Sequence, residues 1–431
     1  MTTTTGSLYI LFFFIGFIID FSETSELTWL QNFSILIGQI IIGINSLSWG
    51  VVRVWFGQRS DRSKYSRYKQ CLIVSVIPFI AWVIIAIGFD SISIILCLLA
   101  IEMSFAAINT IIESVMVIES NRENDLSIVA KCHRAKLIGK MIANGLGGII
   151  LSKSGSIKLI FWLQTICVGG LFCFLLLLSY RSVTYEVVIT TDEDDVSPIE
   201  DGVSPIEGGV SPIEGGVSTI EDVVDKDTSS PIKPTLSTSL ILFVTLFSSV
   251  PLGYSPLFYF MFGPLEITAA DIGLIESITA FTSIICTFIA PRYVGTKIQW
   301  ICYVVSVLLV LVHLGRYICV SRLTVMDGYS TQNIDFYLLL LTFILYETAD
   351  GLIWLTYASR SSANAKAGEE AKSYAYYITL PTFGKFIRIG IDSILTNELH
   401  VDHDQYGLYP DYLTICVYCS LLCVIFTVFI K

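Results

Sequence analysis

Ionisable side chains recur at helical spacing inside four apolar stretches of the sequence. Glu102, Asn109 and Glu113 are 7 and 4 residues apart, and an α-helix that turns about 100° per residue places them on one face. An ionisable group inside a membrane costs roughly 2.5–3.5 kcal/mol on insertion scales, so it normally faces a partner or a wet cavity. This stripe could therefore contact a charged solute or carry a proton.

Three further stripes follow the same spacing rule. They consist of His133, Lys136, Lys140 and Asn144, then Glu347 and Asp350, and finally Lys385, Arg388 and Asp392. In each half of the chain an acidic stripe precedes a basic one. One interpretation is that the charges form structural ion pairs within each half. The favoured interpretation is a solute pathway, in which cations meet an anionic substrate and a carboxylate carries a coupling proton. The predicted substrate-binding residues are Glu113, Lys136, Lys140, Glu347, Asp350, Lys385 and Arg388.

Twelve apolar runs supply the elements that must position these stripes. The chain has 431 residues, of which 54% are hydrophobic and only 15% charged, whereas soluble proteins are about 25% charged. A run of about 20 apolar residues can cross a hydrocarbon core of about 30 Å as a helix. The first run is interpreted as a retained helix, because it lacks the basic segment and cleavage site of a signal peptide. The runs lie near residues 7–22, 30–56, 70–89, 91–118, 127–152, 157–180, 237–262, 268–290, 298–318, 334–358, 373–396 and 411–430.

The segment 182–234 differs from the rest of the chain. It holds 13 acidic and 2 basic residues, which accounts for the whole formal net charge of −11 and leaves no basic surface typical of nucleic-acid binding. Four tandem heptapeptides begin at Val196, Val203, Val210 and Val217, and prolines in the first three exclude a continuous helix. We predict an acidic, disordered cytoplasmic linker, which is either a spacer or, through its Ser-Pro pairs, a regulatory segment.

The linker separates six spans in residues 1–181 from six spans in residues 235–431. Two six-helix halves related by a pseudo-two-fold axis along the membrane normal are typical of the major facilitator superfamily. The sequence therefore predicts an all-α polytopic membrane protein with twelve transmembrane helices in two pseudo-symmetric halves. Loops on one side hold 15 Lys or Arg residues and those on the other side hold 3. The positive-inside rule then predicts that both termini are cytoplasmic, in the plasma membrane or an organelle membrane.

A polar hairpin follows the second predicted span. It reads Gly57-Gln-Arg-Ser-Asp61-Arg62 and continues with Arg67-Tyr68-Lys69. Glycine permits close backbone approach, and an aspartate can cap or pair with a neighbouring helix end. The hairpin resembles the loop between the second and third helices of major facilitator proteins, which latches one conformation. That resemblance implies gating roles for Asp61 and Arg62.

Longer runs resemble the folate–biopterin transporter family. Arg53-Val-Trp-Phe-Gly57-Gln-Arg-Ser-Asp61 is similar to that family's Lys-Pro-x-Tyr-Gly-x-x-Ser-Asp, although Val54 replaces the proline. Val117-Ile-Glu119-Ser-Asn-Arg122 resembles its Val-Val-Glu-Arg-x-Arg, and Glu347-Thr-Ala stands where the family has Glu-Ala-Thr. Shorter similarities include Phe258-Tyr259-Phe260. The gating residues predicted from the motifs and the hairpin are Arg53, Gly57, Asp61, Arg62, Glu119 and Arg122.

The resemblance implies a monomeric secondary transporter for a small anionic heteroaromatic solute of folate or biopterin type. Transport would proceed by alternating access, with a proton as the candidate coupling ion and hence symport. Cations would bind carboxylates, and a ring could stack on Trp354, Tyr357, Tyr374, Tyr376 or Tyr377. The alternatives are a carrier for a sugar or nucleoside, a polytopic membrane enzyme, and a transport-dead receptor or scaffold.

No cofactor or metal site is expected. His400, Asp402, His403 and Asp404 have the types of metal ligands but are interpreted as a solvated loop. His313 and Arg316 are predicted near the outer end of a helix, where long side chains reach water by snorkelling.

Overall fold

Helices make up the framework of this protein in the computed structural model. The structure describes residues 3–22, 26, 29, 35–88, 90–193, 236–252, 257, 261, 267–290, 298–323, 334–399 and 409–430. Within these residues it contains α-helices, one short 3₁₀ helix at Thr427–Phe429 and no β-strand. The heptapeptide repeats, the run 258–260 and the loop 400–404 lie outside the described residues.

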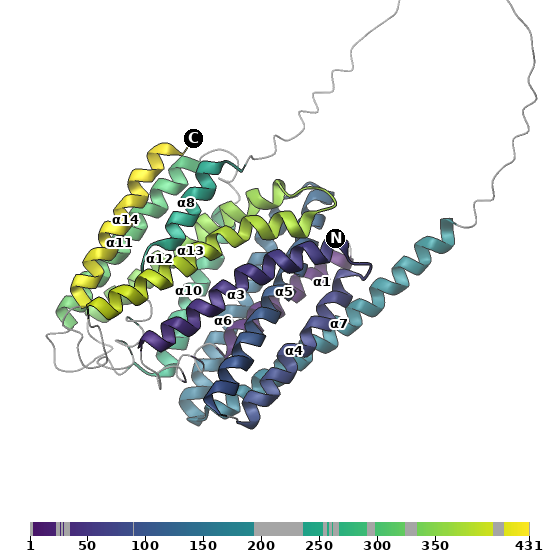
Figure 1. Ribbon diagram of the computed structural model, residues 1–431, viewed down its shortest axis with the longest axis horizontal. Helices are drawn as coiled ribbons and strands as arrows, with labels where there is room; N and C mark the ends of the chain where they lie inside the picture. Colours follow the sequence, from purple (N-terminus) through teal and green to yellow (C-terminus); the bar gives the residue numbers. More distant parts are fainter. Residues whose placement is uncertain are drawn as a thin grey trace, which may run out of the picture.

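The α-helices of the described residues fall into two groups of six. The first group is α1 (Thr3–Phe21), α3 (Ile35–Arg62), α4 (Arg67–Ile87), α5 (Ser91–Glu123), α6 (Ser127–Ser154) and α7 (Ile157–Glu193). The second group is α8 (Thr238–Ser249), α10 (Ala269–Ile289), α11 (Ile298–Leu323), α12 (Ile334–Ala363), α13 (Glu370–Glu398) and α14 (Tyr409–Phe426). Figure 1 shows the two groups side by side, with α3 and α13 adjacent on the near face. The main contacts between the groups are α3 with α13 and α6 with α10.

Eight of the described helices are long and apolar enough to cross a membrane. Two others, α1 and α8, are apolar but shorter. The remaining two are α6 and α13, whose basic stripes introduce charges into otherwise apolar helices. Hydropathy alone therefore misses two of the helices that carry charged residues of the site, although the twelve-helix count predicted from the sequence is confirmed.

Local sequence signals set several helix ends. Asp90 caps α5, and hydrogen bonds from the hydroxyl and then the amide of Ser93 hold the pKa of the Asp90 carboxyl below its ordinary value. Thr268 and Asp271 form a capping box at the start of α10. Gly155 ends α6 with φ of 60°, a conformation that favours glycine.

The last helix of the first group is longer than its membrane span. The span predicted at 157–180 coincides with the apolar part of α7, Ile157–Tyr180, whereas the helix continues through Arg181 to Glu193, into the segment predicted to be linker from residue 182. Residues 182–193 contain neither proline nor glycine, so nothing in the local sequence stops the helix before the first repeat.

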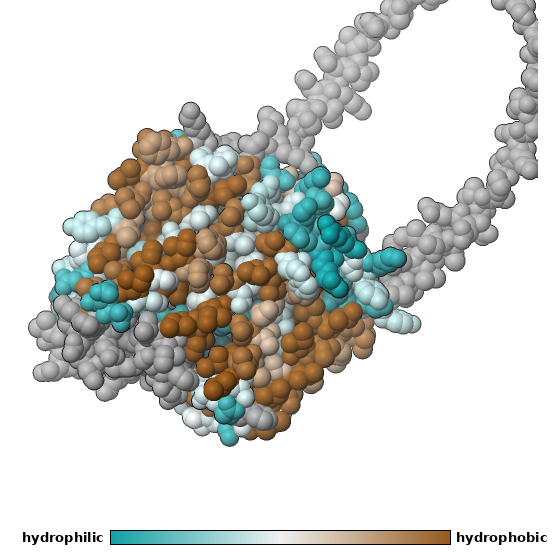
Figure 2. Space-filling view, viewed as in Figure 1, coloured by the Kyte–Doolittle hydropathy of each residue, from teal (hydrophilic) through white to brown (hydrophobic). Residues whose placement is uncertain are grey.

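The flanks of the helix bundle carry many exposed apolar side chains. Ile92, Ile166, Leu177, Ile394 and Ile425 are each at least 60% exposed. Figure 2 shows hydrophobic residues over most of the near face, with hydrophilic residues gathered near the end where the N-terminus lies. A soluble protein rarely exposes apolar surface on this scale, so these flanks fit a lipid environment.

Close helix contact in the first group depends on α6 glycines. A Cβ added at Gly139 would lie 2.2 Å from the Phe13 carbonyl oxygen and 2.7 Å from the Phe17 nitrogen, both in the backbone of α1. A Cβ at Gly170, in contrast, meets nothing within 4 Å. We expect Gly139→Ala to lower the unfolding free energy by about 1–3 kcal/mol, because α1 must move away from α6. Thermal unfolding of purified protein measures this. Gly170→Ala is the control and should leave stability unchanged or slightly higher; equal effects of the two variants would contradict the prediction.

Candidate functional site

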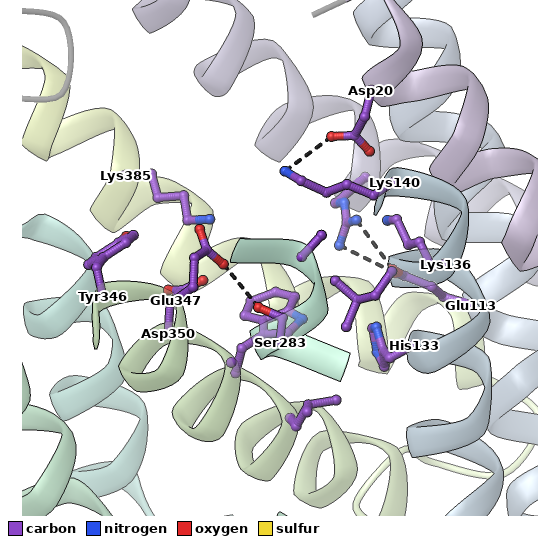
Figure 3. A pocket seen from close by; sticks show the side chains of 16 residues that line it. Asp20, Glu113, His133, Lys136, Lys140, Ser283, Tyr346, Glu347, Asp350 and Lys385 are labelled. Atoms are coloured by element: carbon purple, nitrogen blue, oxygen red, sulfur yellow. Dashed lines mark hydrogen bonds and ion pairs between the residues drawn. The ribbon is translucent and has the colours of Figure 1, made fainter. Parts of the chain in front are cut away.

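A cavity of about 290 Å³ lies between the two helix groups. Figure 3 shows its charged side chains converging from α1, α5 and α6 on one side and from α12 and α13 on the other. Six of the seven predicted substrate-binding residues line it: Glu113, Lys136, Lys140, Glu347, Asp350 and Lys385. The other polar or aromatic lining residues are Asp20, Arg53, His133, Ser283, Tyr346 and Trp354. The four stripes thus meet in one place.

On the side of the first group, Glu113 is the centre of a buried polar network. Its carboxylate forms an ion pair with Arg53 at 3.3 Å, and the two side chains are only 3% and 5% exposed. The Asn109 amide donates to the same carboxylate at 3.0 Å, and the Lys136 ammonium donates to the Asn109 oxygen at 3.3 Å. Lys136 therefore reaches Glu113 only through Asn109. Among the described residues, Lys136 forms no direct ion pair with a carboxylate.

Lys140 pairs across helices rather than with Glu113. Its ammonium lies 3.2 Å from the Asp20 carboxylate of α1 and 4.0 Å from that of Glu276 in α10. The Glu276 contact links the two helix groups. Asp20 was not among the predicted site residues, although it is the one ionisable residue of an otherwise apolar first run. That isolation was the signal that could have identified it.

On the side of the second group, fewer of the charged side chains are paired with an opposite charge than on the side of the first. The Ser283 hydroxyl of α10 donates to Glu347 at 3.0 Å. The Lys385 ammonium lies 6.0 Å from the centre of the Trp354 ring, at the outer limit of a cation–π contact. In the described part of the chain, Glu347, Asp350 and Lys385 form no ion pair with one another. The alternative interpretation expected structural ion pairs between these side chains, and none is found among the described residues.

Arg388 is the predicted substrate-binding residue that does not line the cavity. Its guanidinium donates to the Tyr346 hydroxyl at 3.4 Å, and Tyr346 is a lining residue. Asp392, one turn further along α13, accepts a hydrogen bond from the Tyr412 hydroxyl of α14. Lys385 and Arg388 are three residues apart and therefore about 60° apart around the helix, so one can line the cavity while the other lies beside it.

Two of the predicted gating residues bring α3 against α13. The Asp61 carboxylate accepts backbone N–H groups of Ala371 at 3.2 Å and Lys372 at 2.8 Å, in the first turn of α13. Arg67 also donates to Asp61, at 3.1 Å. A carboxylate at a helix N-terminus is stabilised by the unpaired N–H groups and the helix dipole. Gly57 permits the approach, because an added Cβ would lie 2.8 Å from the Ala371 carbonyl oxygen.

The other predicted gating residues lie elsewhere. Arg53 lines the cavity and pairs with Glu113. Arg122 pairs with Glu119 at 2.5 Å within one turn of α5. Arg62 is exposed and has no ion pair among the described residues.

Three further expectations can be compared with the structure. Of the candidate stacking residues, Trp354 lines the cavity, whereas Tyr357 and Tyr374 are buried and do not appear in its lining. The snorkelling interpretation of His313 and Arg316 is wrong, because both are fully buried and Arg316 donates to the Leu252 carbonyl at 2.9 Å. Within the described residues there is no cluster of three or more His, Cys, Asp or Glu side chains that could hold a metal ion.

The fold is that of the major facilitator transporters. A point mutant of the nucleoside transporter NupG superposes with a TM-score of 0.63 at 13% identity, covering 99% of this chain and 100% of that one. The human organic anion transporter MFSD10 (TETRAN) gives a TM-score of 0.61 at 11% identity, with coverages of 99% and 100%. The D-xylose–proton symporter gives 0.62 at 12% identity, with coverages of 97% and 96%. At these identities the likeness establishes the fold alone.

A model of the BT1 family matches residues 34–431. The chain belongs to the BT1 family, and the family resemblance found in the sequence motifs is confirmed. No curated protein matches the sequence. Family and fold together define a multi-pass membrane transporter.

Proposed function

We propose that this protein is a secondary active transporter for a small, anionic heteroaromatic solute of folate or biopterin type. The observation that carries the proposal is the central cavity, in which cations and carboxylates converge from both helix groups around Trp354 and Tyr346. Its volume of about 290 Å³ is near the lower end of the range of about 300–1,000 Å³ for small-molecule pockets. A cavity of that size accommodates one bicyclic ring.

The charge arrangement supports two kinds of contact. Lys136 and Lys385 lack a carboxylate partner among the described residues, so each can bind an anionic group of the solute. Glu347 and Asp350 lie on the side of Lys385, across the cavity from Lys136, and can accept N–H donors from a heteroaromatic ring. Trp354 offers a flat face to such a ring.

The same charges support a proposal of proton coupling. The lining contains four Lys or Arg side chains and four carboxylates, so an incoming anion enters a cavity without net charge. Protonation of Glu347 or Asp350 would then reduce the repulsion of the anion. We infer that one of these two carboxylates takes up a proton with the solute.

The contact between Asp61 and the start of α13 is proposed to be a gate of alternating access. It joins a helix of residues 1–181 to a helix of residues 235–431, so it must open when the two halves separate at this end. The loop charges, 15 against 3, favour the cytoplasm for this end and for both termini. We further propose that the segment 182–234 is a cytoplasmic connection between the halves and that the monomer is the transporting unit.

Asp61→Asn is expected to slow solute uptake by about 10- to 100-fold, because the amide keeps the size of the carboxylate but loses its charge at the helix N-terminus. Uptake into proteoliposomes and solute binding by the purified protein should be measured together. Binding should be retained, since Asp61 does not line the cavity.

Glu369→Gln is a matched control for Asp61→Asn. Glu369 lies at the same end and pairs with Lys366 and Lys372 through exposed i,i+3 contacts. Exposed pairs of this kind contribute little, so uptake should stay within about twofold of the wild type. Equal effects of the two variants would show that Asp61 has no special role in gating.

The proposed substrate class can be tested by uptake of labelled biopterin, folate, a nucleoside and xylose into proteoliposomes. We expect saturable uptake of biopterin or folate. Lys140→Ala should reduce it strongly, because Lys140 lines the cavity and pairs with Asp20. Arg388→Ala should have a smaller effect, exerted through Tyr346. Uptake of only the nucleoside or the sugar would show that the substrate is not a folate or biopterin. Absence of any uptake would favour a receptor or scaffold.

A further inference from the structure

A groove on the outside of the protein follows the contact between α3 and α13. It has a volume of about 460 Å³, and its lining is almost entirely apolar. Leu47, Val51, Trp55 and Phe383 line it and are between 39% and 63% exposed. Figure 1 shows the two helices adjacent on the near face of the molecule. The groove is thus formed by both helix groups and is open to the surroundings of the bundle.

One end of this groove continues into a basic pocket. Arg59, Arg62 and Ser63 line a second hollow of about 350 Å³, and Trp55 and Gln58 belong to both hollows. The Arg59 guanidinium lies 5.6 Å from the Trp55 ring centre, which holds it at the junction. Neither arginine forms an ion pair with a carboxylate among the described residues. Two exposed cations therefore stand at the end of an apolar channel without a counterion from the described part of the protein.

The dimensions of this combined surface match one leaflet of a bilayer. Leu47 and Arg62 are 15 residues apart on a single helix, which corresponds to about 22 Å at 1.5 Å per residue. A bilayer is about 40–45 Å thick with its headgroups, so half of it is also about 22 Å. Tryptophan at the level of Trp55, with arginines just beyond it, is the usual order of side chains from the apolar core to the interface.

We propose that this surface binds one anionic phospholipid. Arg59 and Arg62 contact its phosphate, and an acyl chain lies in the groove between α3 and α13. Charge complementarity selects an anionic headgroup, because both basic side chains lack a counterion among the described residues. The open, apolar lining beside Val51 and Phe383 selects a long acyl chain over a soluble phosphate.

The position of the lipid has a mechanical consequence. Thr379 and Phe383 come from α13, whereas the other lining residues come from α3. A lipid held here contacts both helix groups, and it lies on the same pair of helices as the Asp61 contact. Its affinity must therefore depend on how far the two helices are apart, and by linkage the bound lipid favours the arrangement in which they pack closely.

The test is retention of phosphatidylglycerol by the full chain, measured by native mass spectrometry and by titration into detergent-solubilised protein. Arg59→Gln with Arg62→Gln should weaken phosphatidylglycerol binding about thirtyfold, as expected from about 1 kcal/mol per basic residue. Binding of phosphatidylcholine should change much less. The control is Lys64→Gln with Lys69→Gln, which removes the same charge from exposed positions of the same hairpin outside the groove.

A second variant tests whether an acyl chain lies in the groove between α3 and α13. Val51→Trp fills the groove without altering charge, and it should reduce binding of dioleoyl phosphatidylglycerol while leaving the short-chain dihexanoyl lipid unaffected. Size-exclusion profiles and thermal unfolding confirm that each variant is folded. The proposal is overturned if the arginine variant retains phosphatidylglycerol like the wild type, or if the lysine control loses it equally. Because lipid binding is read without transport, failure here leaves the proposed function untouched.

Discussion

Glu113→Gln is expected to lower the unfolding free energy by about 3–5 kcal/mol, because it leaves the buried Arg53 guanidinium without its carboxylate. The two side chains are 5% exposed or less, so only water within the cavity could replace the lost partner. Asn109 would also lose a charged acceptor at 3.0 Å, which adds to the cost. Arg53→Gln should be comparably destabilising, since the uncompensated charge is then a buried carboxylate. Denaturant or thermal unfolding in detergent measures both effects.

The double variant Arg53→Met with Glu113→Leu separates stability from function. Removing both charges leaves no unpaired ion, so most of the lost stability should return, whereas transport should not. Glu123→Gln is the control, because its contact with Arg122 at 3.8 Å is exposed and should contribute less than about 1 kcal/mol. If Glu113→Gln loses no more stability than this control, the pair is not the buried anchor described above.

The sequence was most informative about which helix faces carry charge. Helical periodicity alone assigned Glu113, Lys136 and Lys140 to stripes, and these side chains do meet in one cavity. This succeeded because a spanning helix has few polar residues, so each polar residue is a strong signal. The same charges lower the hydropathy of α6 and α13, whose spans were predicted from their apolar runs at 127–152 and 373–396.

Partner assignment could not be read from the sequence. Ion pairing within the first half left either Lys136 or Lys140 as the partner of Glu113, whereas the structure pairs Glu113 with Arg53 and Lys140 with Asp20 of α1. This difference arises because a stripe fixes direction around one helix axis but not depth along a neighbouring helix, which depends on packing. The family motif likewise identified Arg53 but gave no information about its partner Glu113.

The sequence also does not reveal which charged side chains are buried. Arg316 follows a long apolar run and was interpreted as reaching water, yet it is fully buried and donates to the Leu252 carbonyl. The backbone oxygen of Leu252, just beyond the end of α8, is an acceptor that no sequence pattern reveals. Arg388 is the opposite case. Its stripe predicted that it contacts the solute, but it reaches the cavity only through its hydrogen bond to Tyr346.

Glu347→Gln is expected to reduce uptake driven by a pH gradient at least about tenfold, because the amide cannot carry a proton. Glu347 lines the cavity, accepts a hydrogen bond from Ser283 and has no ion pair among the described residues. A carboxylate without a fixed cation can change its protonation state with the bound solute, whereas the charge of one paired like Glu113 is already compensated by an arginine. Uptake should be measured with and without an imposed gradient, together with solute exchange at equal pH, which should persist.

Two neighbouring variants sharpen this test. Ser283→Ala removes the hydroxyl donor but keeps the carboxylate, so uptake should fall by a smaller factor and still respond to the gradient. Asp350→Asn changes the second carboxylate of the same cavity, one turn along α12. Loss of the gradient response in that variant alone would assign the proton to Asp350. A normal response in both carboxylate variants would contradict proton coupling at this site, and the solute charge would then have to be balanced by Lys136 and Lys385 alone.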